Sequence, residues 1–220
     1  GVDAWGSGFC YDYQAIQLMK QMLGSEHCCR VLGLDCGMGD TLLQVKNELR
    51  YLRRGVELYQ LTCQQEYLED IKPHSQKAQL VPILSEGVEA AFEGKNFNLI
   101  YLGRDIGQYE EPSRLLQVVS RRLAPGGWFV CTCENPFSAA ILHSLLRFSV
   151  PEGRVRWSLA DPEQIHKQAQ KCFAQVQMIP VEMPVEGVEA FAACHYGKTD
   201  GFSQLVTRLK TGRYYFACRA

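Results

Sequence analysis

The stretch RVLGLDCGMGD, residues 30–40, gives the strongest indication of how this chain folds. It begins as an apolar run and passes through Gly37 and Gly39 into DTLLQVKNEL, a segment with the spacing of an amphipathic helix. A strand, a glycine turn and a helix in this order let backbone N–H groups approach a nucleotide-like ligand closely. Asp35 stands directly before the glycines, although acid and glycines are not in the order expected of such a loop.

Strand-like and helical segments alternate along most of the chain. This order predicts an α/β fold, a Rossmann-like, seven-stranded and mostly parallel sheet with helices on both faces. Residues 184–212 need no crossover helix, so we expect the last strand to be antiparallel, and we expect a single domain over residues 1–220. The expected strands are 30–34, 53–58, 78–84, 97–103, 125–133, 173–183 and 213–220.

Composition and charge exclude several classes of function. The 220 residues carry a formal net charge of −1 and a sequence pI of about 6.6, so no basic field is present to hold nucleic acid. No apolar run has the length of a membrane span, and the N-terminus shows no signal-peptide pattern. Because the sequence begins at Gly1 without Met, a trimmed chain and a domain cut from a longer polypeptide both stay open.

The ten cysteines include no C-x-x-C pair. This pattern favours buried free thiols in a reducing, cytoplasmic environment over a metal site.

The glycine turn should lie where strand order reverses, since ligands bind there in open α/β sheets. Glu57 follows Gly37 at the distance typical of an acid that binds a ribose diol, and we expect it to end the second strand. The alternative is a plain tight turn with a surface glutamate.

Several motifs together resemble class I S-adenosylmethionine (SAM)-dependent methyltransferases, over about residues 11–220. VLGLDCGMG at 31–39 is similar to that family's VLDLGCGTG loop, and GVE at 55–57 to its GVE or GVD. FNLI at 97–100, RLAPGG at 122–127 and ENP at 134–136 match further segments. The likeness is nearest to methyltransferase domains of glycan biosynthesis and to quinone O-methyltransferases. It implies SAM as cofactor and a small-molecule or glycan-like acceptor.

The resemblance implies roles for residues after the first expected strand and at the end of the second. Gly37 and Gly39 would lie against the methionine part of SAM. Glu57 would bind the ribose hydroxyls, and Leu58 would lie beside the adenine.

It implies further contacts elsewhere in the chain. Ser85 and Glu86 match a loop that contacts adenine, and either Tyr11 or Tyr13 matches an aromatic residue that closes over the cofactor. The residues expected at the sulfonium end are Leu102, Gly103 and Arg104.

The sequence departs from the family pattern at three places. Gly33 stands where the family has the acid that fixes the SAM amino group, and Asp35 replaces the first glycine. Asp35 could point into the same space, but a buried carboxylate there needs a donor. Arg104 brings positive charge near a sulfonium, and Gln108, a weak catalytic candidate, replaces a histidine and is no base near neutral pH.

Other weak catalytic candidates follow the fifth strand. Asn135 could orient an acceptor or cap the next helix, and His143 lies on a segment that reads as an amphipathic helix. Residues 189–202 could form a substrate lid or contact a partner domain.

Three hypotheses therefore stay open. The first is a SAM-dependent methyltransferase domain. The second is a catalytically inactive scaffold or interaction domain of a larger protein, indicated by the departures at Gly33, Asp35, Arg104 and Gln108. The third, an NAD oxidoreductase, is disfavoured because DCGMGD lacks the third glycine of that fingerprint.

Overall fold

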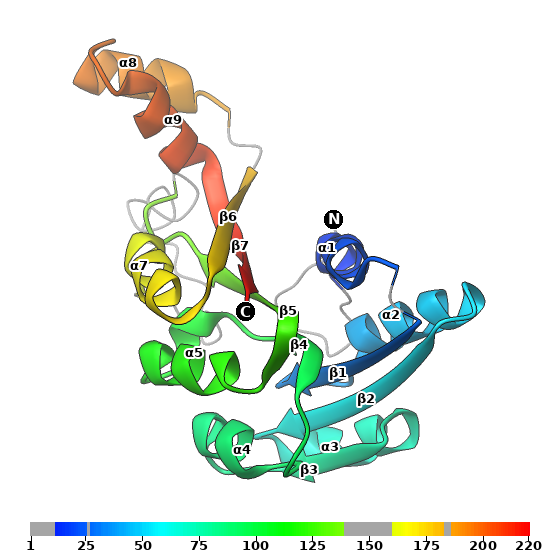
Figure 1. Cartoon of the computed structure of the whole chain (residues 1–220). Helices are drawn as coiled ribbons and strands as arrows, with labels where there is room; N and C mark the ends of the chain where they lie inside the picture. The colour runs from blue at the N-terminus through cyan, green and yellow to red at the C-terminus, as the bar shows by residue number, and fades with distance from the viewer. Residues whose placement is uncertain (1–11, 26, 139–159, 183–185) are drawn as a thin grey trace.

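The computed structural model describes residues 12–25, 27–138, 160–182 and 186–220 (Figure 1). Its strands are β1 Cys28–Leu34, β2 Gly55–Thr62, β3 Lys77–Leu80, β4 Phe97–Leu102, β5 Leu123–Glu134, β6 Gln175–Glu182 and β7 Thr211–Arg219. Its α-helices are α1 Tyr13–Leu23, α2 Asp40–Tyr51, α3 Gln65–Ile71, α4 Leu84–Ala90, α5 Pro112–Ser120, α7 Pro162–Cys172, α8 Val188–Tyr196 and α9 Phe202–Lys210. Two short 3-10 turns, η1 Lys72–His74 and η2 Ile106–Gln108, follow α3 and β4.

The described strands form one seven-stranded sheet in the order β3-β2-β1-β4-β5-β7-β6. β1 to β5 pair in parallel, whereas β7 runs antiparallel to both β5 and β6. The predicted α/β sheet with an antiparallel last strand is therefore confirmed. Because the chain leaves β1 toward β2 and later returns to β4 on the other side, strand order reverses between β1 and β4.

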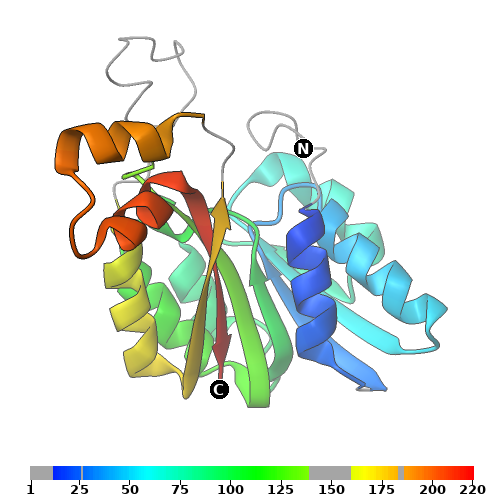
Figure 2. The ribbon, with the colours of Figure 1, turned by 90° about the horizontal axis from the view of Figure 1, so that it is seen from above.

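Helices cover both faces of the sheet (Figure 2). α1 and α2 pack on one face against buried side chains such as Val31, Leu99 and Val130. α4, α5 and α7 pack on the other face, where Phe97 and Phe129 are fully buried. Apolar residues therefore continue through the central strands, as in parallel sheets covered on both sides.

Side-chain caps fix where several helices begin. Asp12 accepts a hydrogen bond from the Ala15 amide at 3.0 Å at the start of α1, and its own amide donates to Thr41 Oγ1 on α2 at 3.0 Å. Asp161 caps α7 in the same way through the Glu163 amide. The contact between Asp12 and Thr41 also holds the start of α1 beside α2.

Three element boundaries differ from the sequence prediction. β2 continues to Thr62, so Glu57 does not end it, and β3 stops at Leu80. β6 and β7 are antiparallel neighbours as expected, but two helices, α8 and α9, stand between them in the chain. Apart from Ser138, the expected helix over 138–148 lies outside the described residues.

Candidate functional site

The carboxyl ends of β1 and β4 border the candidate ligand crevice, since strand order reverses there. The loop after β1 turns through Gly37 at φ +57° and Gly39 at φ +82°, backbone conformations that favour glycine. A Cβ built on Gly37 meets nothing within 4 Å, so space is open beside it. Within the described part of the chain, no hydrogen bond engages the amides of Gly37 and Met38. The loop thus combines open space beside the Gly37 Cβ position with two amide donors that have no partner among the described residues.

Asp35 is buried, at 4 % exposure, and bridges two other loops. Its Oδ1 accepts a hydrogen bond from the Cys63 amide at 2.7 Å, beyond the end of β2. Its Oδ2 accepts one from the Tyr109 hydroxyl at 2.7 Å, on the segment after β4. The donors that the sequence required for this carboxylate are therefore Cys63 and Tyr109.

The Asp35 bridge changes the acidity of its neighbours. Burial and, after it, the Asp35 carboxylate raise the pKa of Tyr109 well above its ordinary value. The same two causes raise the pKa of the Cys63 thiol to about 11. The Tyr109 phenol therefore stays protonated at neutral pH and can keep donating its proton to Asp35.

The loops after β1 and β4 touch directly at the floor of the crevice. A Cβ on Gly103 would lie 2.6 Å from Cys36 Cα and 2.8 Å from the Asp35 carbonyl oxygen. A Cβ on Gly33, the place of the family acid, would lie 2.5 Å from Leu42 Cδ1. Leu42 therefore occupies the space that an acid at position 33 would need.

Glu57 lies at the other end of the sheet from the glycine loop. It stands directly opposite Arg30 in the parallel pairing and forms an ion pair with Arg30 Nε at 3.0 Å. The expectation that Glu57 ends the second strand is wrong, because buried Leu58, Tyr59 and Leu61 continue the strand. Leu58 likewise packs in the core on the α1 and α2 face.

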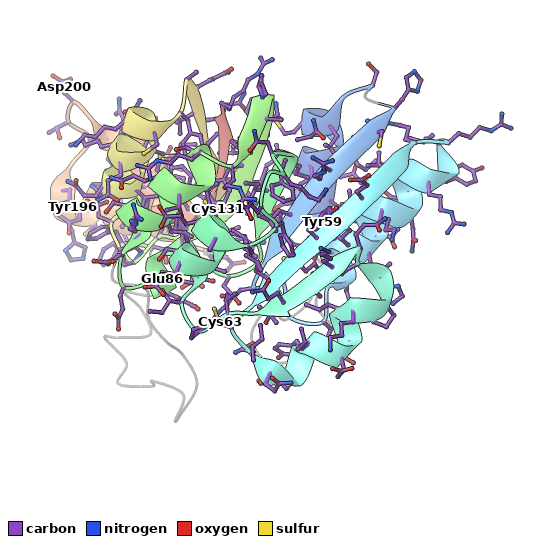
Figure 3. All side chains as sticks on the ribbon, turned by 60° about the horizontal axis from the view of Figure 1, so that its bottom comes forward. Tyr59, Cys63, Glu86, Cys131, Tyr196 and Asp200 are labelled. Carbon is purple, nitrogen blue, oxygen red and sulfur yellow. The ribbon has the colours of Figure 1, made fainter. Side chains whose placement is uncertain are left out.

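Thr62 ends β2 in place of an acid. Its side chain is buried, and its hydroxyl accepts from the Gln64 amide at 3.1 Å in a local turn. Cys63 follows directly, and Figure 3 shows it beyond the end of the strand that holds Tyr59. The residue beside the crevice on this side is thus a cysteine whose amide is already bound to Asp35.

Ser85 and Glu86 lie in the first turn of α4 rather than in a loop, and Figure 3 places Glu86 on that helix. Leu102 ends β4 with its side chain in the core. Arg104 donates to Gln108 Oε1 at 3.1 Å on the exposed side of η2. The structure therefore brings Gly103, Arg104 and Gln108 to the crevice edge.

Two predicted positions, Tyr11 and His143, lie outside the described residues. Tyr13, the alternative to Tyr11, is the first residue of α1 and is 65 % exposed.

A second polar group lies on the α1 face, where β5 ends and β7 begins. Glu134 stands opposite Arg213 in the antiparallel pairing. Tyr215, two residues further along β7, donates a short hydrogen bond to Asp12 Oδ2. The Glu134 amide donates a short hydrogen bond to Asp105 Oδ2. The segment after β4 and the N-terminus of α1 thus meet around Glu134 and Arg213.

Burial and the Asp105 carboxylate raise the pKa of Glu134 to about 7, while the Arg213 guanidinium acts in the opposite direction. Glu134 is half-buried. A carboxyl group with a pKa near the working pH can exchange a proton with a ligand.

Asn135 is fully buried, and its side-chain polar groups are engaged. Its Nδ2 donates to the carbonyls of Arg208 and Thr211, both at 2.8 Å, and its Oδ1 accepts from the Phe137 amide at 3.1 Å. Asn135 therefore anchors the end of α9 and the start of β7. This placement disfavours the expectation that it orients an acceptor.

Four residues at the site had no assigned role in the sequence prediction: Thr62, Cys63, Tyr109 and Glu134. Only Glu134 had a sequence signal, because ENP places an acid at the carboxyl end of a strand. Tyr109 and Asp35 are 74 residues apart, so their contact depends on the tertiary fold.

Among the described residues, no group of three or more His, Cys, Asp or Glu side chains could hold a metal ion. The same part of the chain has no helix long and apolar enough to cross a membrane.

No protein-family model and no curated protein matches the chain. Solved structures match it over nearly its whole length. The [4+2]-cyclase SpnF is 16% identical, with a TM-score of 0.59, over 97% of this chain and 84% of that chain. A SAM-dependent methyltransferase from Archaeoglobus fulgidus is 15% identical, with a TM-score of 0.58, over 95% of this chain and 100% of that one.

Phosphoethanolamine N-methyltransferase 2 of Haemonchus contortus, in complex with phosphomonomethylethanolamine and S-adenosylhomocysteine, matches over 98% of this chain at 17% identity and a TM-score of 0.61. This chain spans only 55% of that protein. The chain has the class I SAM-dependent methyltransferase fold. At these identities the comparisons show the fold alone, and the ligand has to be argued from the site.

Proposed function

We propose that this chain is a SAM-dependent methyltransferase domain that acts on a small-molecule or glycan-like acceptor. The observation that carries the proposal is the glycine loop at the point where strand order reverses. Gly37 leaves open space beside the loop, and the amides of Gly37 and Met38 have no partner within the described residues. A carboxylate, such as that of the methionine part of SAM, fits such donors.

The residues present fit this cofactor in part. The Gly37 and Met38 amides would hold its carboxylate, whereas the space beside Gly103 is taken by the backbone of Asp35 and Cys36. Thr62 stands at the end of β2 where an acid would bind the ribose. Glu57 lies near the start of the same strand and is too distant to replace it. When bound, SAM supplies an electrophilic methyl group. The protein then has to place the acceptor in line with it and exclude water.

Glu134 is the group best suited to take a proton from the acceptor. It lies at the carboxyl end of β5 on the α1 face, and its pKa of about 7 leaves a large fraction ionised near neutral pH. Arg213 opposite it would hold a negatively charged part of the acceptor. Asp12 and Tyr215 extend the same polar group toward α1.

We also propose that the chain works in the cytoplasm. The nine described cysteines are free thiols, which suits a reducing compartment. A small-molecule ligand requires no nucleic acid or membrane partner.

A specific observation favours a second function, a noncatalytic scaffold or interaction domain. Asp35 ties the loops after β1, β2 and β4 together across the crevice. A partner domain or protein would then be the ligand of this chain.

Calorimetric titration with S-adenosylhomocysteine (SAH) and with SAM tests the first proposal. We expect saturable binding to the wild-type chain, and none to Gly37→Val, because valine fills the open space beside the loop. Circular dichroism has to show that both proteins are folded. The absence of binding heat at about millimolar ligand would favour the scaffold function instead. A Kd of about 1 mM corresponds to only ~4 kcal/mol of binding free energy.

A further inference from the structure

We propose that the hydrogen bond from Tyr109 to Asp35 is an autoinhibitory latch across the ligand crevice, which a ligand has to open. The inference rests on the proposed function, because the latch joins the loops after β1 and β4, between which SAM would bind. It concerns a different property, namely how the closed chain controls entry to that crevice.

The latch spans the two sides of the crevice. Asp35 follows β1, and Tyr109 lies on the segment after β4, the two strands between which strand order reverses. The loops already touch at the floor, where Gly103 packs on Cys36. The hydrogen bond of 2.7 Å between Tyr109 and Asp35 therefore joins the loops after β1 and β4 a second time, beyond the strand ends. A ligand that occupies the switch point has to part these two side chains.

Asp35 is held from two sides in the closed arrangement. Asp35 is almost fully buried, and its second oxygen is held by the Cys63 amide at 2.7 Å. Hydrogen bonds to a buried carboxylate are among the stronger ones in proteins. Loss of the Tyr109 donor would leave one carboxylate oxygen desolvated in the closed state, which favours opening.

Asp35 is also held in an uncommon backbone conformation. Its φ is +48°, a region that residues with a Cβ adopt rarely and that usually depends on fixed partners. Its amide donates to the Leu61 carbonyl at 2.9 Å, which fixes the turn from the β2 side. Asp35 therefore holds the latch in a backbone conformation that glycine would adopt without strain, which is why Asp35→Gly is a suitable test variant.

The latch lowers the apparent affinity of any crevice ligand. Apparent affinity scales with the fraction of molecules whose crevice is open. Removal of one hydrogen bond to a charged group shifts such an equilibrium by about tenfold. Tyr109→Phe should thus bind SAH about tenfold more tightly than wild type, because phenylalanine keeps the ring and removes the donor.

The experiment compares wild type, Tyr109→Phe, Asp35→Gly and Tyr51→Phe. Tyr51 is 88 % exposed on α2 and serves as the matched control for loss of a tyrosine hydroxyl. Two quantities are measured for each protein: the Kd for SAH by calorimetry, and amide hydrogen exchange over residues 103–111 without ligand. We expect tighter SAH binding and faster exchange in Tyr109→Phe and in Asp35→Gly, and wild-type values in Tyr51→Phe.

The two readouts separate the latch from the proposed function. Wild-type exchange over 103–111 in both latch variants, together with unchanged SAH affinity, overturns the latch. Faster exchange in both variants without SAH binding to any protein supports the latch and refutes the proposed cofactor. Weaker SAH binding in folded Tyr109→Phe also overturns the latch, because it makes the Tyr109 hydroxyl a contact of the ligand.

Discussion

Glu134 on β5 and Arg213 on β7 stand directly opposite each other in the antiparallel pair of these two strands. Arg213 also lies 3.8 Å from Asp12 Oδ2, and its guanidinium donates to the Tyr215 hydroxyl at 3.1 Å. The arginine thus stands between carboxylates from two different elements. Its charge opposes the burial and the Asp105 carboxylate that keep Glu134 hard to ionise.

This arrangement predicts how the Glu134 carboxyl group titrates. Its pKa of about 7 should rise in Arg213→Gln, since the favourable positive charge is lost, and fall in Asp105→Asn, since a negative charge is lost. Carboxyl chemical shifts followed by NMR between pH 4 and 9 measure this directly. A Glu134 midpoint that stays at its ordinary value of about 4.5 would contradict the burial seen here.

The same group predicts a pH dependence of stability. The native pKa of Glu134 lies above its unfolded value of 4.5, so its stabilising effect is present below pH 4.5 and is lost as pH rises through about 7. Glu134→Gln should therefore match wild type at pH 4 and be more stable at pH 8, by about 1 kcal/mol after allowance for solvent. Urea unfolding at both pH values measures the difference. Equal stabilisation at the two pH values would point to packing instead of ionisation.

Arg122 should be the most sensitive charged residue for stability outside the crevice. Its guanidinium makes five hydrogen bonds to the carbonyls of Val88, Ala91, Phe92 and Lys95. We expect Arg122→Met to lower the free energy of unfolding by about 2–4 kcal/mol, because four carbonyls lose a charged donor. Urea denaturation checks this.

The matched control is its neighbour Arg121, whose side chain is 62% exposed and, within the described residues, makes only a long ion pair of 3.9 Å to Glu89. Arg121→Met should change stability by less than about 0.5 kcal/mol. Similar losses in the two variants would refute a special role for Arg122.

Gly103 should tolerate no side chain. An alanine Cβ would lie within 2.6 Å of Cys36 Cα, which belongs to the backbone of the opposite loop and cannot simply rotate away. We expect Gly103→Ala to lower the free energy of unfolding by about 1–3 kcal/mol. Gly55→Ala is the control, because a Cβ there meets its nearest neighbour at an ordinary 3.7 Å. Thermal unfolding curves that coincide for the two variants would contradict the close contact.

Glu57 predicts a negative result. Its ion pair with Arg30 lies near the start of β2, at the opposite end of the sheet from the glycine loop, and the Glu57 side chain is 39% exposed. Glu57→Gln should leave the Kd for SAH unchanged and should cost only about 0.2–1 kcal/mol of stability. Calorimetry with SAH decides between this placement and the role implied by sequence resemblance. Loss of binding in a folded Glu57→Gln protein would restore that role.

The sheet could be predicted from sequence because its signals are local. Each central strand is an apolar run, and the order of runs and helices leaves few topologies. The end of β2 was missed because it depends on a contact that is not local. Gln60 breaks the apolar pattern, yet it is buried because its Nε2 donates to Ser75 Oγ at 3.0 Å, a partner 15 residues away.

The candidate site was less predictable because its contacts join distant segments. Sequence reasoning placed Asp35 at the crevice and required a donor for it, but the donors lie on two other loops. The polar group around Glu134 depends on β7 lying beside β5, at the far end of the chain. α8 carries too weak a helical pattern in EAFAACHYGKTDGF to separate it from a lid, and α9 begins only at the last residue of that segment, Phe202.

Amide NMR of the wild-type chain titrated with SAH tests whether the glycine loop is a cofactor site. We predict that the amide signals of Gly37 and Met38 shift with a saturable dependence on SAH, since these amides have no partner among the described residues and the Gly37 Cβ position borders open space. Signals of Arg30 and Glu57, at the other end of the sheet, should stay in place. Gly37 and Met38 signals that do not move at saturating SAH would contradict this placement of the cofactor. The absence of any shift at about millimolar SAH would also contradict it, since a Kd of that size corresponds to only ~4 kcal/mol of binding free energy.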